Sequence, residues 1–359
     1  MARKHTRRQF LHGRSLTDAV EDMLDGTQAE PTTPETKVSY LRFGRKAMAC
    51  QFEAVFDVYR FRQGAEAALK ALDFVDELEQ QLSVYREDSE VSRLNRTAGQ
   101  GPVRVAENLW KLIQVGLTLH QETQGAFDLT AGPLSKVWGF YRRSGGIPDE
   151  VSLQTAMQKV GSAAVKLDEQ GQTVEFQKPG LELNFGGIGK GYALDEAGRI
   201  MFTHGVDDFL LHGGASSVLA CSSAGMQAAT AWPVGVGHPL KPGKQLVEIQ
   251  LMNRGLSTSG SGTQFFRHAG RRYGHILDPR TGQPADGLLS VTVTAPSAAL
   301  ADALSTAFYV LGVEKSMDYC AKHPEIAALF VLPSTGGRVQ TQAAGFAEGE
   351  LVWETEPAD

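Results

Sequence analysis

The alternation of apolar and polar residues predicts the secondary structure of much of the chain. Strand-like alternation begins within residues 38–56, "VSYLRFGRKAMACQFEAVF". Residues 64–82 and 106–123 instead place apolar side chains at helical spacing, as amphipathic helices do. The buried stripes that we expect on these two helices contain Leu69, Leu72, Val75, Leu78 and Leu82 in the first, and Leu109, Leu112 and Ile113 in the second.

The pattern changes after residue 163, where strand candidates follow one another. They lie at residues 163–177, 208–221, 246–252 and 288–296. Strands and helices do not alternate regularly, and several of the strands look hairpin-linked. We therefore predict an α+β fold with largely antiparallel sheets flanked by helices. The globular domain is expected over residues 38–355, after a polar, Pro/Thr-rich and disordered tail at residues 1–37.

Composition mainly excludes classes of function. The net charge is -6, and no basic stretch is interleaved with aromatic residues, so we expect no nucleic-acid binding. The 3 cysteines are widely spaced and the 9 histidines are scattered, which argues against a disulfide framework and a zinc cluster. No run of about 18 apolar residues occurs, so we expect no transmembrane segment.

The beginning of the chain raises a question of location. Residues 6–11, "TRRQFL", are similar to the start of a twin-arginine export signal. The residues that follow carry charges and lack both an apolar segment and a small-residue cleavage site. We expect a cytoplasmic location, with export through a degenerate signal as the alternative.

The segment "ADALSTAFYVLG" at residues 301–312 reads as a helix with an unusual polar face. Asp302, Ser305 and Thr306 stand at i, i+3 and i+4, so a carboxylate and two hydroxyls share one side of an otherwise apolar helix. Capping or a solvated edge would explain this spacing. A metal site is the other interpretation, because hard cations prefer oxygen ligands.

Two more segments combine glycines with polar residues. In "LNFGGIGKGYALDEA" (183–197), a strand running into glycines and then a helix would leave bare N–H groups at a helix N-terminus, which suits a phosphate. The spacing is neither that of a Walker A motif nor a good dinucleotide fingerprint, and a structural turn stays open. In "YGHILDPRTGQPA" (273–285), a tight turn carries His275, Asp278, Arg280 and Thr281 beside a hydrophobic strand.

These segments, taken in order with a few others, closely resemble the motifs of the FAD:protein FMN transferase (ApbE) family. The others are "MAC" (48–50), "LSVYREDSEVSRLN" (82–95), "GAFDLTAGPLSKVWGF" (125–140) and "STSGSGTQFF" (257–266). The resemblance extends from residue 42 to about residue 335 and implies the family's architecture, which is related to the T-fold.

The resemblance also implies an activity. Members of the family bind FAD, use Mg²⁺ to cleave its pyrophosphate, attach FMN through a phosphoester bond to a Thr or Ser of a client protein, and release AMP.

The metal positions that carry over are Asp302, Thr306, Ser305 and the backbone carbonyl near Gly187. The flavin contacts that carry over are Met48, Tyr85, Ala126, Phe127, Asp128, Asn184, Lys190, Ile276 and Leu277. His275 is the candidate to meet a phosphate or to take the client hydroxyl's proton, since histidine titrates near neutrality. The catalytic residues that we expect are therefore His275 and Asp302.

Some positions depart from the family pattern. Asn184 stands where an Asp is usual, and Ala49 and Cys50 replace the Gly and Thr of the Met-Gly-Thr motif. "GGASS" (213–217) lacks the usual Asp, and "TSGSGTQ" lacks the Asp-Tyr that commonly follows its glycine. These changes bear on FAD affinity and client choice more than on the reaction.

Three functions are compatible with the sequence. The first is a Mg²⁺-dependent flavin transferase whose client is a redox or electron-transport protein with a short Ser/Thr-containing motif. The second is an FAD pyrophosphatase, in which water replaces the client hydroxyl. The third is a flavin-binding protein without turnover.

Overall fold

The computed structural model describes residues 38–223, 231–262 and 264–354. The predicted tail at residues 1–37, with its twin-arginine-like segment, lies outside this part of the chain. None of the described helices is long and apolar enough to cross a membrane.

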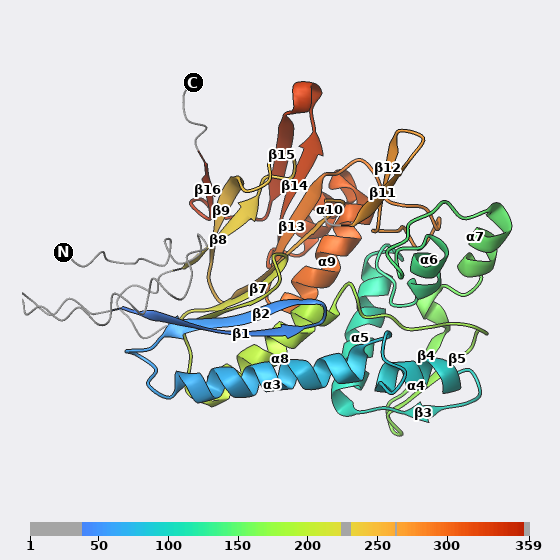
Figure 1. Ribbon diagram of the computed structural model, residues 1–359, viewed down its shortest axis with the longest axis horizontal. Helices are drawn as coiled ribbons and strands as arrows, with labels where there is room; N and C mark the ends of the chain where they lie inside the picture. The colour runs from blue at the N-terminus through green and yellow to red at the C-terminus, as the bar shows by residue number, and fades with distance from the viewer. Residues whose placement is uncertain (1–37, 224–230, 263, 355–359) are drawn as a thin grey trace, which may run out of the picture.

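An eight-stranded antiparallel sheet forms the centre of the molecule, in the order β1-β2-β6-β7-β10-β13-β14-β15 (Figure 1). Its strands are β1 (Tyr40–Ala47), β2 (Cys50–Asp57), β6 (Phe209–Gly213), β7 (Ser217–Cys221), β10 (Arg254–Gly260), β13 (Ser290–Ala295), β14 (Ala327–Pro333) and β15 (Val339–Ala344). Three small sheets accompany it. Their strands are β8 (Trp232–Gly237), β9 (Gln245–Leu251) and β16 (Leu351–Trp353); β11 (Phe265–His268) and β12 (Arg271–Gly274); and β3 (Val103–Arg104), β4 (Val165–Asp168) and β5 (Thr173–Phe176).

Helices cover one face of the central sheet and build a lobe beside it (Figure 1). The covering helices are α3 (Gly64–Leu82), α8 (Gly189–Thr203), α9 (Ala298–Leu311) and α10 (Val313–Lys322). The lobe contains α4 (Glu90–Thr97), α5 (Glu107–Glu122), α6 (Gly132–Val137), α7 (Glu150–Met157) and the short turn η1 (Ser162–Ala164); a second short turn, η2 (Thr335–Gly337), joins β14 to β15.

The core has three parts. The main cluster lies between the central sheet and the covering helices, where Phe56, Leu194 and Phe308 are fully or almost fully buried. A second cluster, around Trp232 and Ile249, joins the small β8-β9-β16 sheet to the central sheet. A third, around Trp138, fills the lobe beside α6 and α7.

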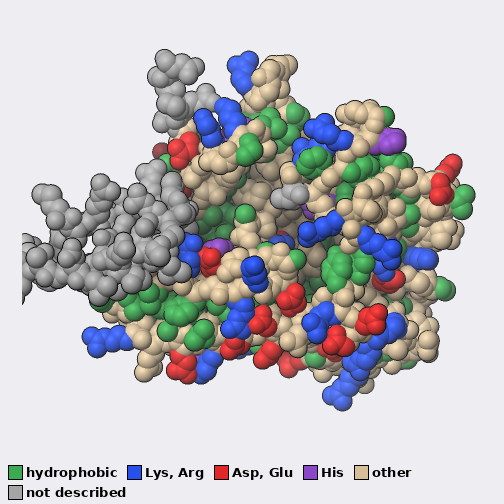
Figure 2. All heavy atoms as spheres, in the orientation of Figure 1, with side chains coloured by type: hydrophobic (Ala, Val, Ile, Leu, Met, Phe, Trp, Pro, Cys, Tyr) green, Lys and Arg blue, Asp and Glu red, His purple; other side chains and the backbone are tan. Residues whose placement is uncertain are grey.

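The predicted α+β class with largely antiparallel sheets is confirmed. One position of the predicted stripes is wrong: Leu69 is 47% exposed, because α3 buries small residues such as Ala68 and Ala71 instead. A second expectation is also wrong: residues 183–185, which precede the glycines of the segment 183–197 and were expected to form a strand, are not part of any sheet. Charges of both signs are interspersed on the face shown in Figure 2, most visibly along its lower rim.

Candidate active site

The polar face of α9 is buried, which rules out the solvated edge considered above. Asp302 is 4% exposed and Ser305 is 0% exposed. The Asp302 carboxylate accepts hydrogen bonds from three elements at once. Oδ1 receives the hydroxyls of Ser257 on β10 (2.9 Å) and Ser217 on β7 (3.3 Å), and Oδ2 receives the backbone N–H of Gly191 on α8 (3.2 Å).

Ser305 and Thr306 continue this face one turn later. The Ser305 hydroxyl donates to the Asp302 carbonyl (2.9 Å), and the hydroxyl of Ser259 on β10 lies 2.9 Å from that of Ser305 and 3.2 Å from that of Thr306. Hydroxyls of β7 and β10 therefore bind the Asp302 carboxylate, and a second group of hydroxyls, from α9 and β10, lies at the Asp302 carbonyl one turn later. Each of them can donate or accept, so the cluster can adjust to a ligand.

The glycine-rich segment meets this cluster at the start of α8. A Cβ added to Gly187 would lie 3.6 Å from the Thr306 hydroxyl and 3.3 Å from the Phe127 ring, so the backbone here runs against both residues. Lys190 Nζ lies 3.4 Å from Asp302 Oδ1. Asn184 precedes the loop and its Oδ1 accepts the N–H of Gly186 (2.9 Å), which shapes the turn. Positive charge and a helix N-terminus thus lie beside Asp302, an arrangement that suits a phosphate.

His275 is half-buried and lies near the positive charge of Lys190. Its Nδ1 lies 3.1 Å from the backbone carbonyl of Gln264, and because a carbonyl only accepts, Nδ1 carries the proton and Nε2 keeps a free lone pair. Burial lowers the pKa of His275, the hydrogen bond to Gln264 opposes this, and the nearby Lys190 cation lowers the pKa further. The imidazole is therefore neutral near pH 7 and suited to accept a proton.

The β1–β2 hairpin brings its turn to this region. Met48 and Ala49 form a two-residue turn in which both have positive φ, 48° and 59°, a conformation that usually calls for Asn or Gly. Cys50 follows, and its thiol pKa is raised by burial and lowered in part by the charge of Lys190. The hairpin end that carries Met48 therefore lies near Lys190.

The segment 126–128 is buried, and its side chains serve different purposes. Ala126 and Phe127 are 1% and 4% exposed, with the Phe127 ring beside Gly187. Asp128 accepts hydrogen bonds from the backbone N–H groups of Thr130 (2.7 Å) and Ser162 (3.2 Å), from both of their hydroxyls, and from His120 (3.2 Å). Its carboxylate is thus engaged inside the protein, so that a flavin contact predicted at this position would have to come from the backbone.

Tyr85 lies at the rim of the lobe and is 68% exposed. Its ring stacks on Tyr141, with centroids 4.5 Å apart and planes at 19°. Lys136 lies over the other aromatic ring of this pair, 5.6 Å from the Tyr141 centroid, and forms an ion pair with Glu182. Tyr85 and Tyr141 together form an aromatic platform, which a flat ring system can stack upon.

In the turn after His275, polar side chains bind one another. Asp278 binds the Arg280 side chain through two bonds of 2.8 Å, and Leu277 pairs with Pro284 as an isolated bridge. Ile276 and Leu277 are 7% and 9% exposed. The segment therefore contains the tight turn that the sequence predicts, and the two apolar residues lie next to His275.

The donor set fits a magnesium ion by its chemistry. Asp302, Thr306 and the Gly187 backbone offer a carboxylate, a hydroxyl and a carbonyl, all hard oxygen ligands. Within the described residues there is no group of three or more His, Cys, Asp or Glu side chains that could hold a metal. An ion here would therefore depend on Asp302 for protein charge and on phosphate oxygens and water for the rest.

Sequence reasoning missed Ser217, Ser257 and Ser259, which all lie beside α9. In the sequence, the segments that contain them, "GGASS" and "STSG", drew attention because each lacks residues that are usual in the family, and their serines received no role. Their serines reach Asp302 and Ser305 because β7 pairs with β10 in register, with Ser217 opposite Ser257. That register is a long-range property that no local pattern shows.

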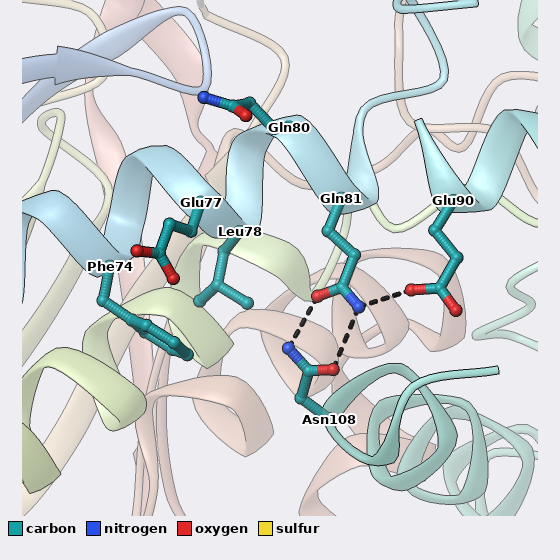
Figure 3. A pocket seen from close by; sticks show the side chains of 7 residues that line it. All are labelled: Phe74, Glu77, Leu78, Gln80, Gln81, Glu90 and Asn108. Atoms are coloured by element: carbon teal, nitrogen blue, oxygen red, sulfur yellow. Dashed lines mark hydrogen bonds between the residues drawn. The ribbon is translucent and has the colours of Figure 1, made fainter. Parts of the chain in front are cut away.

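A separate groove of about 360 Å³ lies on the other side of α3 and is lined by Phe74, Glu77, Leu78, Gln80, Gln81, Glu90 and Asn108 (Figure 3). Gln81 and Asn108 exchange two hydrogen bonds, of 2.6 and 3.0 Å, and Gln81 also donates to Glu90. The groove contains none of the predicted site residues, and these polar groups bind one another.

Comparison with known proteins identifies the family of the chain. The model of the ApbE family matches residues 48–330. The FAD:protein FMN transferase of Treponema pallidum (strain Nichols) is 33% identical over 291 residues, 77% of this chain and 80% of the relative. That of Escherichia coli (strain K12) is 30% identical over 316 residues, 86% of this chain and 88% of the relative.

The crystal structure of the ApbE protein of Thermotoga maritima has a TM-score of 0.75 at 29% identity, covering 84% of this chain and 96% of that one. The apo flavinyl transferase ApbE of Pseudomonas stutzeri also gives 0.75 at 29% identity, covering 86% and 95%.

Proposed function

Because the chain belongs to the ApbE family, we propose that it is an FAD:protein FMN transferase that uses Mg²⁺ and releases AMP. The observation that carries this proposal is the buried Asp302, held among hydroxyls directly beside Lys190 and the N-terminus of α8. A pyrophosphate bound there would meet a cation, bare N–H groups and hard oxygen ligands together. Phosphoryl transfer depends mainly on this kind of positioning and charge neutralisation.

In the proposed reaction, the hydroxyl oxygen of a client Thr or Ser attacks the FMN-side phosphorus of FAD. A phosphoester bond forms, the pyrophosphate P–O bond to AMP breaks, and AMP leaves with that oxygen. The bound metal supplies Lewis-acid charge neutralisation at the phosphates. Nε2 of His275 takes the hydroxyl proton, Lys190 neutralises phosphate charge, and Asp302 and Thr306 hold the metal. The exposed Tyr85–Tyr141 platform offers aromatic surface on which the flavin or the adenine would stack. The client would be a redox or electron-transport protein.

The test is incubation of the protein with FAD and MgCl₂, with and without a candidate client. A transferase releases AMP and leaves flavin covalently bound to the client, which chromatography and the mass of the client report. AMP formed equally without a client identifies a pyrophosphatase, and no AMP in either case identifies a flavin-binding protein. Chelation of the metal with EDTA should abolish AMP release, and unchanged release would contradict the magnesium requirement.

A further inference from the structure

Helices α8 and α9 each cap the other with a carboxylate. Asp195, in the middle of α8, accepts the first two N–H groups of α9: Oδ1 binds Ala298 N (2.7 Å) and Oδ2 binds Ala299 N (2.8 Å). In return, Asp302 of α9 accepts the N–H of Gly191 in the first turn of α8 (3.2 Å). Such N–H groups have no partner within their own helix, so each helix depends on the other.

The two helices touch at the level of the backbone. A Cβ on Gly191 would lie 2.1 Å from the Ala298 carbonyl oxygen, and a Cβ on Gly255 of β10 would lie 2.4 Å from the Ala298 Cα. No larger side chain fits at either glycine, so α8 and β10 both meet the start of α9 directly. At this contact Asp195 of α8 binds the first two N–H groups of α9.

Asp195 and Ser297 cap different N–H groups of α9. Ser297 already serves as the ordinary N-cap of α9, with its hydroxyl accepting the N–H of Leu300 (3.2 Å). Burial raises the pKa of Asp195 to about 6, although its two backbone hydrogen bonds act in the opposite direction. A desolvated carboxylate is an unfavourable choice for a cap, but it can accept two N–H groups at once with a fixed spacing.

We propose that Asp195 is a positioning residue that holds Asp302 and Thr306 at a fixed distance from Gly187 and Lys190. The metal ligands lie on α9, and the groups that meet the phosphates lie on the loop and first turn of α8. The hydrogen bonds of Asp195 connect these two sets of residues, and they lie one helical turn away from Asp302. This inference rests on the proposed function of the site.

The experiment compares Asp195→Asn and Asp195→Ala with Ser297→Ala in the full-length protein. Asn keeps the volume but accepts only one of the two N–H groups, and Ala accepts neither. We expect kcat for AMP release to fall by about tenfold in D195N and on the order of 10²-fold in D195A. The Mg²⁺ concentration for half-maximal rate should rise in the same order. KM for FAD should change less, because the flavin contacts lie elsewhere.

Ser297→Ala is the matched control, since it removes a cap acceptor from the same helix end without touching α8. It should lower the melting temperature and leave the Mg²⁺ dependence within about twofold of wild type. Binding of Mn²⁺ alone, followed by electron paramagnetic resonance, gives a readout independent of turnover and should weaken in D195N but not in S297A.

If D195N and S297A lower the melting temperature while both keep wild-type Mg²⁺ dependence and Mn²⁺ affinity, Asp195 is only a cap and the inference is wrong. If D195A does not fold, the isosteric D195N decides. Wild-type protein that releases no AMP from FAD contradicts the proposed function instead, and the Mn²⁺ measurement still tests Asp195.

Discussion

Two buried aspartates, Asp302 and Asp128, look alike in burial and differ in what surrounds them. Their side chains are 5% and 2% exposed, and each accepts several hydrogen bonds. At Asp128, each carboxylate oxygen receives a backbone N–H, from Thr130 on one side and Ser162 on the other. At Asp302, Oδ2 receives the N–H of Gly191 and Oδ1 receives two hydroxyls, while the Lys190 ammonium lies 3.4–3.5 Å from both oxygens.

From this difference we propose that Asp128 acts as a structural carboxylate and Asp302 as a functional one. Backbone N–H groups can only donate, so Asp128 is committed to its partners. Hydroxyls can reverse their role, and the Lys190 ammonium can turn toward a phosphate. Asp302 therefore has one oxygen whose surroundings can adapt to a ligand. Substituting the same residue, Asn, at both positions tests this contrast.

The largest effect is expected from Asp302→Asn. The amide can place its oxygen toward Gly191 N–H and its NH₂ toward the hydroxyls of Ser217 and Ser257, so the free energy of unfolding should change by less than about 1 kcal/mol. The charge that holds a divalent ion is lost, so AMP release should fall roughly 10³-fold. A coupled AMP assay and thermal unfolding measure the two quantities. Intact AMP release at limiting Mg²⁺ would show that α9 is only a core helix.

Asp128→Asn should do the opposite. In either orientation its NH₂ faces a backbone N–H, of Thr130 or Ser162, and His120 loses its carboxylate partner. Breaking a buried, paired carboxylate in this way should lower the free energy of unfolding by about 3 kcal/mol. The kcat of the folded fraction should stay within about threefold of wild type. Denaturant unfolding and AMP release at low temperature check this. A variant with normal stability and lost turnover would make Asp128 a functional residue.

The contrast also shows how far the sequence can predict a site. The i, i+3, i+4 spacing of Asp302, Ser305 and Thr306 was visible because a helix brings those positions together locally. Asp128 was equally visible as a carboxylate among apolar residues, but its partners His120 and Ser162 come from α5 and η1. Only the folded chain shows that they enclose it.

The same limit applies to the fold. Alternating patterns predicted the antiparallel hairpins, because each face of a strand is defined within a few residues. The prediction that Leu69 is buried failed, because α3 packs through alanines, and a small residue gives a weak pattern. The serines of β7 and β10 depend on strand register, and Tyr141 depends on how the lobe folds back beside Tyr85.

A smaller effect is expected from Thr306→Val, which keeps the shape of the side chain. The Thr306 hydroxyl has only long hydrogen bonds, 3.2 Å to Ser259 and 3.4 Å to the Asp302 carbonyl. Removing one neutral ligand that water can replace should lower AMP release by about tenfold or less. Thr306→Ser, which keeps the hydroxyl, is the control and should retain most of the activity. Equal losses in Thr306→Val and Asp302→Asn, measured at the same Mg²⁺ concentration, would remove the distinction between charged and neutral ligands.

The smallest effect concerns the pH dependence of the Asp128 site. The hydrogen bond to Asp128 raises the pKa of His120 above 6.5, against the effect of burial. Burial alone would raise the pKa of Asp128, but the hydrogen bonds from His120, Thr130 and Ser162 lower it below 3.8. The stabilisation from His120 is complete below pH 6.5 and is lost as the pH rises through its raised pKa. That from Asp128 is complete above pH 3.8 and is lost as the pH falls through its lowered pKa.

The free-energy difference between wild type and Asp128→Asn should therefore be largest between about pH 4 and pH 6.5 and should narrow at higher pH, as His120 loses its proton. Urea unfolding of both proteins across this range measures the difference. His120→Gln provides the control, because in its background the Asp128→Asn difference should no longer narrow above pH 6.5. A difference that stays constant from pH 5 to about pH 9 in the wild-type background would mean that Asp128 does not raise the pKa of His120. Asp128 would then be held by its hydroxyl and backbone donors alone, and the two aspartates would differ only in which of their donors can reverse.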